Sequence, residues 1–305
     1  MTAPVLARPT TRASRFGRMT PRRLLHAAFV YACLLALAAF IALPLGWMLT
    51  AALKPDNVPV FTFPPEWFPT EHFNVGTFVE ALTQPNEPYA RFALNSFLLA
   101  GINIVGAVLS NSLIAYPFAR LTFRGKNVLF AILIGTMLLP APVLLIPQFL
   151  LFFNIGWYGT QDGFPAGYLP LTVPAFTGNA FFVFLLRQYM RTIPKELDEA
   201  ARIDGAGHWT IYWRIIMPLS APALVVVAVF TFLGVWNDFF GPLLYLDDPD
   251  WFTVPLALAT EVTRVGTEWN IVMAATLVAM LPPLIVYGLS QNKLMGGIAS
   301  VGIRG

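Results

Sequence analysis

The sequence contains little of what a soluble enzyme needs. Only 11% of its 305 residues are charged and 57% are hydrophobic, whereas a soluble domain carries roughly 25% charged residues. Its single cysteine, Cys33, lies inside an apolar run, which excludes a disulfide framework and a cysteine-based metal site. No phosphate-cradling loop of the glycine–lysine type occurs, so the chain lacks that means of binding ATP. These absences argue against a single soluble core.

What the chain does contain is a series of long apolar runs, which are typical of membrane-spanning helices. The six predicted spans are Leu24–Leu53, Phe92–Ala119, Asn127–Phe153, Leu169–Arg187, Ile215–Trp236 and Ile271–Ser290. The first run is far longer than the core of a signal peptide, about 7–15 residues, and no small-residue cleavage site follows it. The sequence therefore predicts an all-α membrane protein with six transmembrane helices, whose first helix is retained.

Basic residues are distributed very unevenly between the predicted loops. Of the 19 Lys and Arg residues, only Lys54, Arg91 and Arg264 fall on one side of the membrane, and the other 16 fall on the opposite side. Because Lys and Arg accumulate in cytoplasmic loops, both termini are predicted to be cytoplasmic. The net charge of +3 hides this polarity, and membrane lipid rather than nucleic acid is the expected partner.

These spans and charges divide the chain into five parts. They are a basic cytoplasmic tail (1–23), the first transmembrane helix (24–53), an external loop (54–90), a five-helix core (91–290) with a cytoplasmic loop at about 191–217, and a cytoplasmic C-terminal tail (291–305). Within the external loop, residues 74–82 are predicted to form one short interfacial helix. Between residues 154 and 179, a Gly-, Pro- and aromatic-rich stretch is expected to re-enter the bilayer in part.

Prolines and polar side chains interrupt the core. Pro140, Pro142 and Pro147 are expected to break the third helix, because proline removes backbone hydrogen bonds that must be replaced within protein or a wet cavity. The second helix carries several amide and hydroxyl side chains, and packing between helices explains each of them better than contact with a substrate does. Asp238 is the one acid near membrane depth. An ionisable group there is a functional candidate, but a structural cap is the favoured interpretation.

The longest polar interruption runs from Pro194 to Pro222. Pro194 suits the first turn of a helix, and Leu197, Ala200 and Ala201 then recur at helical spacing. Gly205 is where that helix is expected to break, since glycine tolerates the turn without a steric penalty. A second short helix follows, with apolar Trp209, Tyr212, Trp213 and Ile216. The pattern predicts a bent, amphipathic helix pair along the membrane surface.

Within this stretch, residues 199–201 (Glu-Ala-Ala), 204–206 (Asp-Gly-Ala), Ile216 and 218–219 (Pro-Leu) resemble the coupling-loop signature of ABC-importer permeases. In that family the loop inserts into a cleft of a cytoplasmic ATPase subunit. The resemblance implies ATPase-coupling roles, which fall on Glu199, Ala200, Ala201, Asp204, Gly205, Ala206 and Pro218. An ordinary interfacial amphipathic helix is the alternative explanation for the loop.

The resemblance extends from about Arg91 to Gly305 and is closest to the maltose-type, carbohydrate-uptake branch. Its further matches are Asn95-Ser96, Ala115-Tyr116, Phe123-Arg124-Gly125, Ile146-Pro147, Trp236-Asn237-Asp238-Phe239 and Pro242-Leu243. The glycine-rich ending resembles the tail of the second membrane subunit, which implies contact between the ATPases and Gly302, Arg304 and Gly305, expected as an extended strand. Arginine stands at 304 where the family pattern leads us to expect lysine.

The resemblance also implies the assembly around this chain. The expected partners are a homologous second permease subunit, two ATP-binding subunits, an extracytoplasmic solute-binding protein and membrane lipid. ATP and Mg are expected on the ATP-binding subunits, so this chain itself is expected to bind no cofactor and to be non-catalytic. The expected location is a bacterial or archaeal cytoplasmic membrane.

Two functions remain open. The first is an ATP-driven importer of a sugar or oligosaccharide, with glycerol phosphate or another polar solute as an alternative cargo. The second is a gradient-driven secondary transporter, a class that usually needs ionisable groups within its helices. Only His26 and Asp238 qualify in this chain, which favours the first function. No substrate-binding residue is predicted.

Overall fold

The computed structural model describes residues 21–55, 58–64, 66–67, 73–84, 88–264 and 266–302. Within these residues the chain is helical, apart from turns and one isolated bridge between Gln161 and Phe164. The predicted all-α class is therefore confirmed. The helices of the first half are α1 (Pro21–Ala52), α2 (Gly76–Thr83), α3 (Tyr89–Arg120), α4 (Lys126–Thr136), α5 (Ala141–Asn154), α6 (Tyr168–Thr172), η1 (Val173–Phe176) and α7 (Ala180–Thr192).

The second half contains shorter elements and one long final helix. They are α8 (Glu196–Ile203), α9 (His208–Ile211), the π-helical turn η2 (Tyr212–Ile216), α10 (Met217–Leu219), α11 (Ala221–Trp236), α12 (Phe240–Tyr245), η3 (Pro249–Trp251), α13 (Val254–Val262) and α14 (Trp269–Gly302). The predicted interfacial helix at 74–82 corresponds to α2.

The chain divides into two units, residues 1–48 and 49–305. The described part of the first unit is α1 up to residue 48, where apolar side chains, among them Phe29, Leu35 and Phe40, are exposed. Such a surface is unfavourable in water and suits a helix surrounded by lipid. Cys33 is exposed on the same helix.

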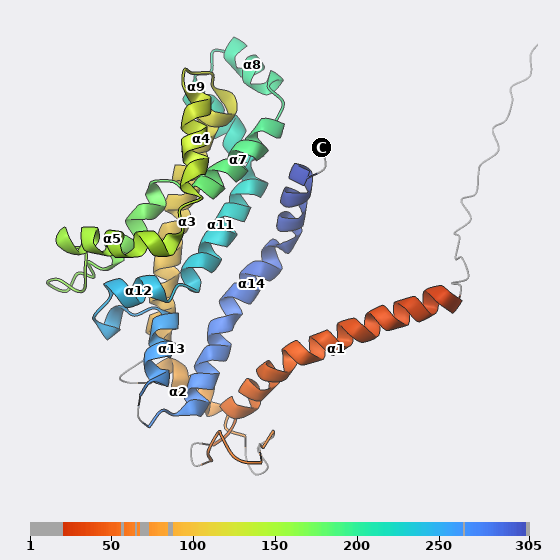
Figure 1. Ribbon diagram of the computed structural model, residues 1–305, viewed down its shortest axis with the longest axis vertical. Helices are drawn as coiled ribbons and strands as arrows, with labels where there is room; N and C mark the ends of the chain where they lie inside the picture. Colours follow the sequence, from red (N-terminus) through yellow and green to blue (C-terminus); the bar gives the residue numbers. More distant parts are fainter. Residues whose placement is uncertain are drawn as a thin grey trace, which may run out of the picture. The chain divides into compact units, whose positions relative to one another are not determined.

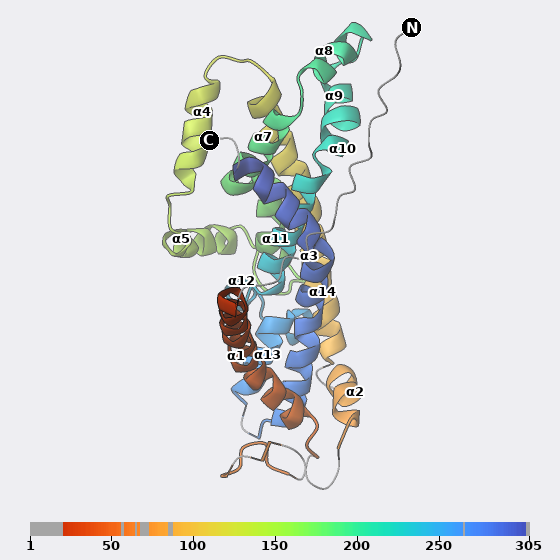
Figure 2. The ribbon, with the colours of Figure 1, turned by 90° about the vertical axis from the view of Figure 1, so that its right-hand side faces the viewer.

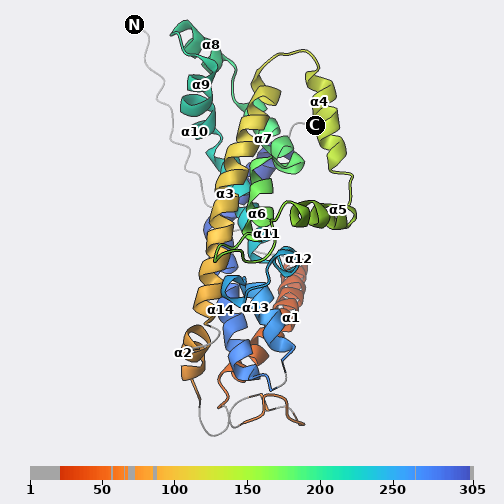
Figure 3. The same ribbon diagram turned by 90° about the vertical axis from the view of Figure 1, so that its left-hand side faces the viewer.

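The second unit is organised around α3. This helix packs against α7 and α11, and α11 packs in turn against α14. Figures 1 and 3 show α8 and α9 at one end of this unit and α2 and α13 at the other. Near the α8 end, a buried cluster joins Ala115 and Tyr116 of α3 to Leu186 and Met190 of α7 and to Ile211 of α9.

Polar side chains on α3 bond to the protein itself. Asn95 donates to the carbonyl oxygens of Asp250 and Phe252, at 2.9 and 3.0 Å. Asn111 accepts a hydrogen bond of 2.6 Å from the Asn179 amide at the start of α7. Ser96, Asn103 and Ser110 likewise bond to backbone groups of the segments that face α3. These bonds agree with the interpretation that the amides and hydroxyls serve helix packing.

The predicted third span is not one helix. It is split at residues 137–140 into α4 and α5 of 11 and 14 residues, and Pro140 lies at this break as expected. The expectation was wrong for Pro142 and Pro147, because Pro142 stands in the first turn of α5 and Pro147 lies inside this helix without ending it. At 1.5 Å per residue these helices are roughly 17 and 21 Å long, shorter than the ~30 Å hydrocarbon core of a bilayer. Figures 1 and 3 show α5 turned across the direction of α4.

The fourth and fifth predicted spans also contain breaks. Between residues 168 and 192, α6, η1 and α7 follow one another, with Gly178 at a φ of +90° before α7. The fifth span was predicted as one helix from Ile215, but the chain bends by 75° between residues 208–219 and α11. Pro222 lacks the N–H group that would bond to the Pro218 carbonyl and extend a helix across Ser220.

Four helical segments in the described residues are long and apolar enough to cross a membrane. They are Leu25–Ala52, Tyr89–Arg120, Tyr168–Thr192 and Trp269–Gln291. A fifth results if the bent pair that ends at Trp236 is one span. The described helices thus provide four or five candidate spans by length and composition.

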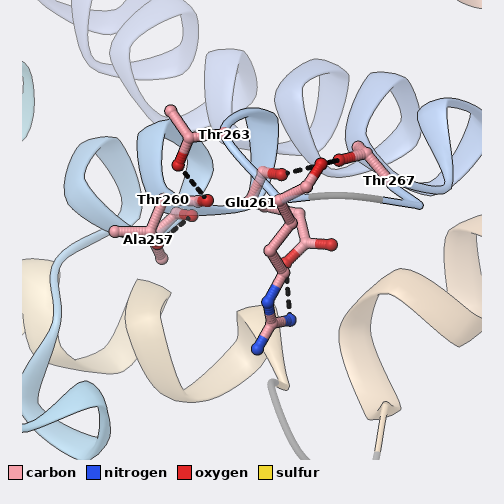
Figure 4. A network of polar contacts seen from close by, with 6 residues as sticks. Ala257, Thr260, Glu261, Thr263 and Thr267 are labelled. Carbon is pink, nitrogen blue, oxygen red and sulfur yellow. Dashed lines mark hydrogen bonds and ion pairs between the residues drawn. The ribbon is translucent and has the colours of Figure 1, made fainter.

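The last part of the second unit runs through α13 into α14. At the end of α13, the Thr267 hydroxyl donates to the Glu261 carbonyl at 2.9 Å (Figure 4). The same hydroxyl donates to the Arg264 carbonyl at 2.7 Å, and the Arg264 side chain pairs with the Glu261 carboxylate at 3.0 Å. Figure 2 shows α14 as one long helix. It continues to Gly302, so the extended strand expected for the glycine-rich ending is wrong as far as residue 302. Glycine lowers helix propensity without forbidding a helix.

Candidate functional site

The predicted bent helix pair is present as α8 and α9. The turn between them is a Schellman motif, in which the Gly205 amide donates to the Arg202 carbonyl at 3.0 Å and the Ala206 amide to the Ala201 carbonyl at 2.9 Å. This motif requires a left-handed residue after the helix, and Gly205 has a φ of +82°. An added Cβ would meet no atom within 4 Å there. Glycine is therefore required by the backbone conformation and not by crowding.

The predicted coupling residues lie on two sides of this pair. Glu199, Ala200, Asp204 and Gly205 are exposed. Ala201 and Ala206 are half-buried and pack against the cluster formed by α3, α7 and α9. Ile203, a residue that the sequence analysis did not single out, is the most exposed large apolar side chain of the pair, at 87%.

A buried ion pair connects α8 to the end of α3. Arg120 Nε lies 3.5 Å from Asp198 Oδ2, and the two side chains are only 1% and 8% exposed. Arg120 also donates through Nη1 to the Ile193 carbonyl at 2.9 Å. Its Nε forms no hydrogen bond in the described structure, and neither does Asp198 Oδ1. The guanidinium thus holds the segment entering α8 by charge and by backbone contact together.

The second half of the loop is packed into the core. Ile211, Tyr212 and Ile216 are at most 1% exposed. The Tyr212 hydroxyl shares a hydrogen bond of 2.7 Å with Ser112 of α3, and the Tyr116 hydroxyl donates to the His208 carbonyl at 3.3 Å. The π-helical turn η2 widens the helix where Tyr212 enters the core, and such turns are frequent at functional sites.

Beneath α8 lies a cavity of about 440 Å³. Its lining carries both charge signs, with Arg120, Lys195 and Arg202 near Asp198 and Glu199. Among the described residues, no group of three or more His, Cys, Asp or Glu side chains could hold a metal ion.

Sequence reasoning missed the residues that hold the loop to α3. Neither Arg120 nor Asp198 belongs to the residues singled out in the sequence, and their pairing joins positions 78 residues apart. Helical spacing places Asp198 on the same side of α8 as Leu197 and Ala201. That position was the only indication in the sequence that this acid is buried.

The other predicted contacts are distributed differently. Pro218 is exposed on α10. Gly302 is the last residue of α14. Arg304 and Gly305 lie outside the described residues.

The model of the family described as "Binding-protein-dependent transport system inner membrane component" matches residues 102–295. The chain belongs to this family. The matched range contains the loop and most of the helices that hold it, so the resemblance to ABC-importer permeases seen in the sequence is confirmed.

Curated relatives of this chain are named as permease proteins of transport or uptake systems. An arabinooligosaccharide transport system permease of Halalkalibacterium halodurans is 29% identical over 88% of this chain and 94% of its own length. A diacetylchitobiose uptake system permease of Streptomyces coelicolor is 26% identical over 90% and 87%. An sn-glycerol-3-phosphate transport system permease of Yersinia pestis is 32% identical over 80% and 85%.

A solved structure shares the fold of this inner membrane component. One chain of a bacterial ABC transporter for import of the acidic polysaccharide alginate aligns with a TM-score of 0.78, covering 90% of this chain and 98% of that one, at 19% identity. At that identity the match supports the fold and not the cargo.

Proposed function

We propose that this chain is a permease subunit of an ATP-driven ABC importer that carries a sugar or oligosaccharide into the cell. In this proposal the chain is non-catalytic and binds no cofactor. ATP and Mg are bound by partner subunits, whose hydrolysis drives alternating access through the loop formed by α8, α9, η2 and α10.

The proposal rests mainly on how α8 is held. Its residues Glu199, Ala200 and Ile203 are exposed on the surface of the chain, while the Arg120–Asp198 pair connects its buried side to α3. A partner that moves α8 would therefore also move the end of a membrane helix. Such a mechanical link is what a non-hydrolysing subunit needs if it is to respond to ATP bound elsewhere.

The proposed cargo class rests on the relatives. Two of those described above are named for oligosaccharide or disaccharide uptake, and one is named for glycerol 3-phosphate. Glycerol phosphate is therefore the second candidate cargo. A gradient-driven mechanism receives little support, because Asp238 is engaged as a cap: its Oδ1 accepts a hydrogen bond from the Gly241 amide at 3.1 Å.

The proposed assembly contains a homologous second permease subunit, two ATP-binding subunits and an extracytoplasmic solute-binding protein. A solved alginate transporter of the same fold, described as a complex with a substrate-bound periplasmic protein, supports the kind of partner. We place the chain in a bacterial or archaeal cytoplasmic membrane, with six crossings and both termini in the cytoplasm. The third crossing would then be made by α4 and α5 together.

The decisive experiment uses the complete complex with its solute-binding protein. ATP hydrolysis and solute uptake are measured with and without the binding protein, first for the native chain and then for Gly205→Val. A β-branched residue at a φ of +82° is strongly disfavoured, so the variant should insert and assemble but lose stimulated hydrolysis and uptake.

Gly207→Val is the matched control. Gly207 lies two residues away with an extended φ of −75°, and an added Cβ there meets no atom within 4 Å. It should retain activity. If Gly205→Val assembles and still supports stimulated hydrolysis and uptake, the loop is not the coupling element. Binding and uptake of oligosaccharides compared with glycerol 3-phosphate then identify the cargo.

Topology is tested separately with single cysteines in a Cys33→Ser background. A cysteine at Gln161 should react with an impermeant thiol reagent in intact cells, whereas one at Lys195 should react only after the membrane is opened. Labelling at position 195 from outside would overturn the proposed orientation.

A further inference from the structure

A second cavity at the α8 end of the unit is lined by one sign of charge. It measures about 310 Å³. Its charged lining residues come from the end of α3, the start of α4, the second half of α7 and the residue before α8, and they are Arg120, Lys126, Arg187, Arg191 and Lys195. In contrast with the cavity beneath α8, no acid is among its described lining residues.

The contacts of these cations orient them and leave most of their charge uncompensated. Lys126 Nζ donates to the Leu121 carbonyl at 2.7 Å. Arg187 donates to the Phe118 carbonyl at 3.1 Å, and its guanidinium carbon lies 3.9 Å from the Phe130 ring centroid. Carbonyls and rings are neutral partners. In the described structure only Arg120 has a carboxylate partner, Asp198.

Crowding of like charges is the electrostatic consequence. Burial lowers the pKa of Lys126, and the nearby charges of Arg187, Arg191 and Lys195 lower it further. Each of these effects disfavours the ammonium form. A bound anion would reverse the second effect, so the cavity is arranged to be more stable with an anion than without one.

An exposed apolar wall adjoins the cavity. No residue of α4 is buried, and Val128, Leu129 and Ile132 are 64%, 51% and 61% exposed. Phe118 of α3 lines the cavity, and Phe130 of α4 packs against it with ring centroids 5.5 Å apart. A free anion would use only the cations, whereas a phospholipid would use the cations and the apolar wall together.

We propose that this cavity binds the phosphate headgroup of an anionic phospholipid whose acyl chains lie along α4. Basic pockets between helices on the cytoplasmic side suit such headgroups, and arginine forks pair with phosphate oxygens. The inference rests on the membrane location of α4 in the proposed function, but not on the cargo or on ATP coupling.

The test measures lipid binding by the complete delipidated transporter complex. Phosphatidylglycerol is titrated in and compared with phosphatidylcholine, and bound lipid is counted by native mass spectrometry. The test variant is Arg191→Gln with Lys195→Gln, because the structure gives neither side chain an internal hydrogen bond or ion pair. The control is Arg124→Gln with Arg214→Gln, which removes the same amount of charge from two exposed positions outside the cavity.

At about 1 kcal/mol per cation near a membrane surface, the test variant should bind phosphatidylglycerol about 30-fold more weakly, and the control should bind it as the native complex does. A variant with Arg191→Lys and Lys195→Arg should restore binding, which excludes a folding defect. Equal binding by test and control variants, or no preference over phosphatidylcholine, would overturn the proposal.

A second arm separates lipid from free anion. A phosphatidylglycerol with a photoreactive acyl chain should label Val128 or Ile132 of α4, and inorganic phosphate should compete only weakly. If phosphate competes fully and α4 is not labelled, the cavity is a soluble-anion site and the lipid assignment is wrong.

Discussion

The two halves of the α8–α10 loop differ sharply in how they are held. In α9 and η2, Ile211, Tyr212 and Ile216 are buried in the core shared with α3 and α7. In α8, Asp198 is the only buried residue. The second half is therefore part of the core, whereas the first half is a projecting helix held mainly by the Arg120–Asp198 pair and by the packing of half-buried Ala201. Changes in the two halves should consequently affect different properties, stability in one and coupling in the other.

The largest expected effect comes from filling the exposed side of α8. Ala200→Trp should abolish binding-protein-stimulated hydrolysis and transport while the thermal midpoint of the chain stays unchanged, because a small exposed residue is replaced by one that overfills a contact with a partner. Thr210→Trp, an exposed position on α9, is the comparison. Equal loss of transport in both variants would mean that the contact surface includes α9 and that the two halves do not differ in this respect.

The next largest effect concerns the ion pair that links α8 to α3. Asp198→Ala leaves the Arg120 guanidinium buried without its carboxylate, and breaking a buried pair in this way costs about 3–5 kcal/mol. The double variant Arg120→Met with Asp198→Leu should be less destabilised than either single change. Thermal midpoints from fluorescence-detected size-exclusion chromatography measure this order. Additive losses would show that the two groups do not interact.

A matched pair of isoleucines compares burial directly. Ile211 is fully buried and Ile203 is 87% exposed. Ile211→Ala should lower stability by about 2–5 kcal/mol, as is typical of a buried isoleucine, whereas Ile203→Ala should change it by no more than ~0.5 kcal/mol. Ile203→Ala should instead weaken ATPase co-purification. Similar thermal midpoints for the two variants would contradict the division of the loop.

The smallest expected effect is that of Glu199→Ala. Its carboxylate is exposed, and a surface ion pair contributes only ~0–1 kcal/mol. The variant should therefore weaken ATPase binding about fivefold at most and leave uptake measurable, with the difference decreasing at high salt. A tenfold or greater loss at high salt would show that Glu199 is buried on assembly and makes more than a surface contact.

Several local features were predictable because they depend on neighbouring residues only. Pro140 was predicted to interrupt the third span, and it lies at the break between α4 and α5, whereas Pro147 lies inside α5 without breaking it. Gly205 was predicted as the turn, and it adopts the left-handed conformation that other residues rarely adopt. Asp238 was interpreted as a cap, and it accepts a backbone hydrogen bond.

Other features could not be predicted because they depend on partners distant in the sequence. The burial of Ile211, Tyr212 and Ile216 depends on the core that α3 and α7 provide. The helix α14 continues through its glycines although glycine has a low helix propensity, because this propensity is only a weak guide to structure. Coupling roles for Ala200 and Gly205 stay predictions, since no partner is present to contact them.

The sequence by itself determined that this chain is a helical membrane protein of a transporter family. The length of its hydrophobic runs, its charge asymmetry and its long spaced motif depend only on the order of residues along the chain. Only the tertiary structure decided which charges meet. It places Arg120 beside Asp198 and gathers Lys126, Arg187 and Arg191 around one cavity. The physical reason is that electrostatic interaction depends on distance and burial, and folding sets both by packing α3, α4 and α7 together.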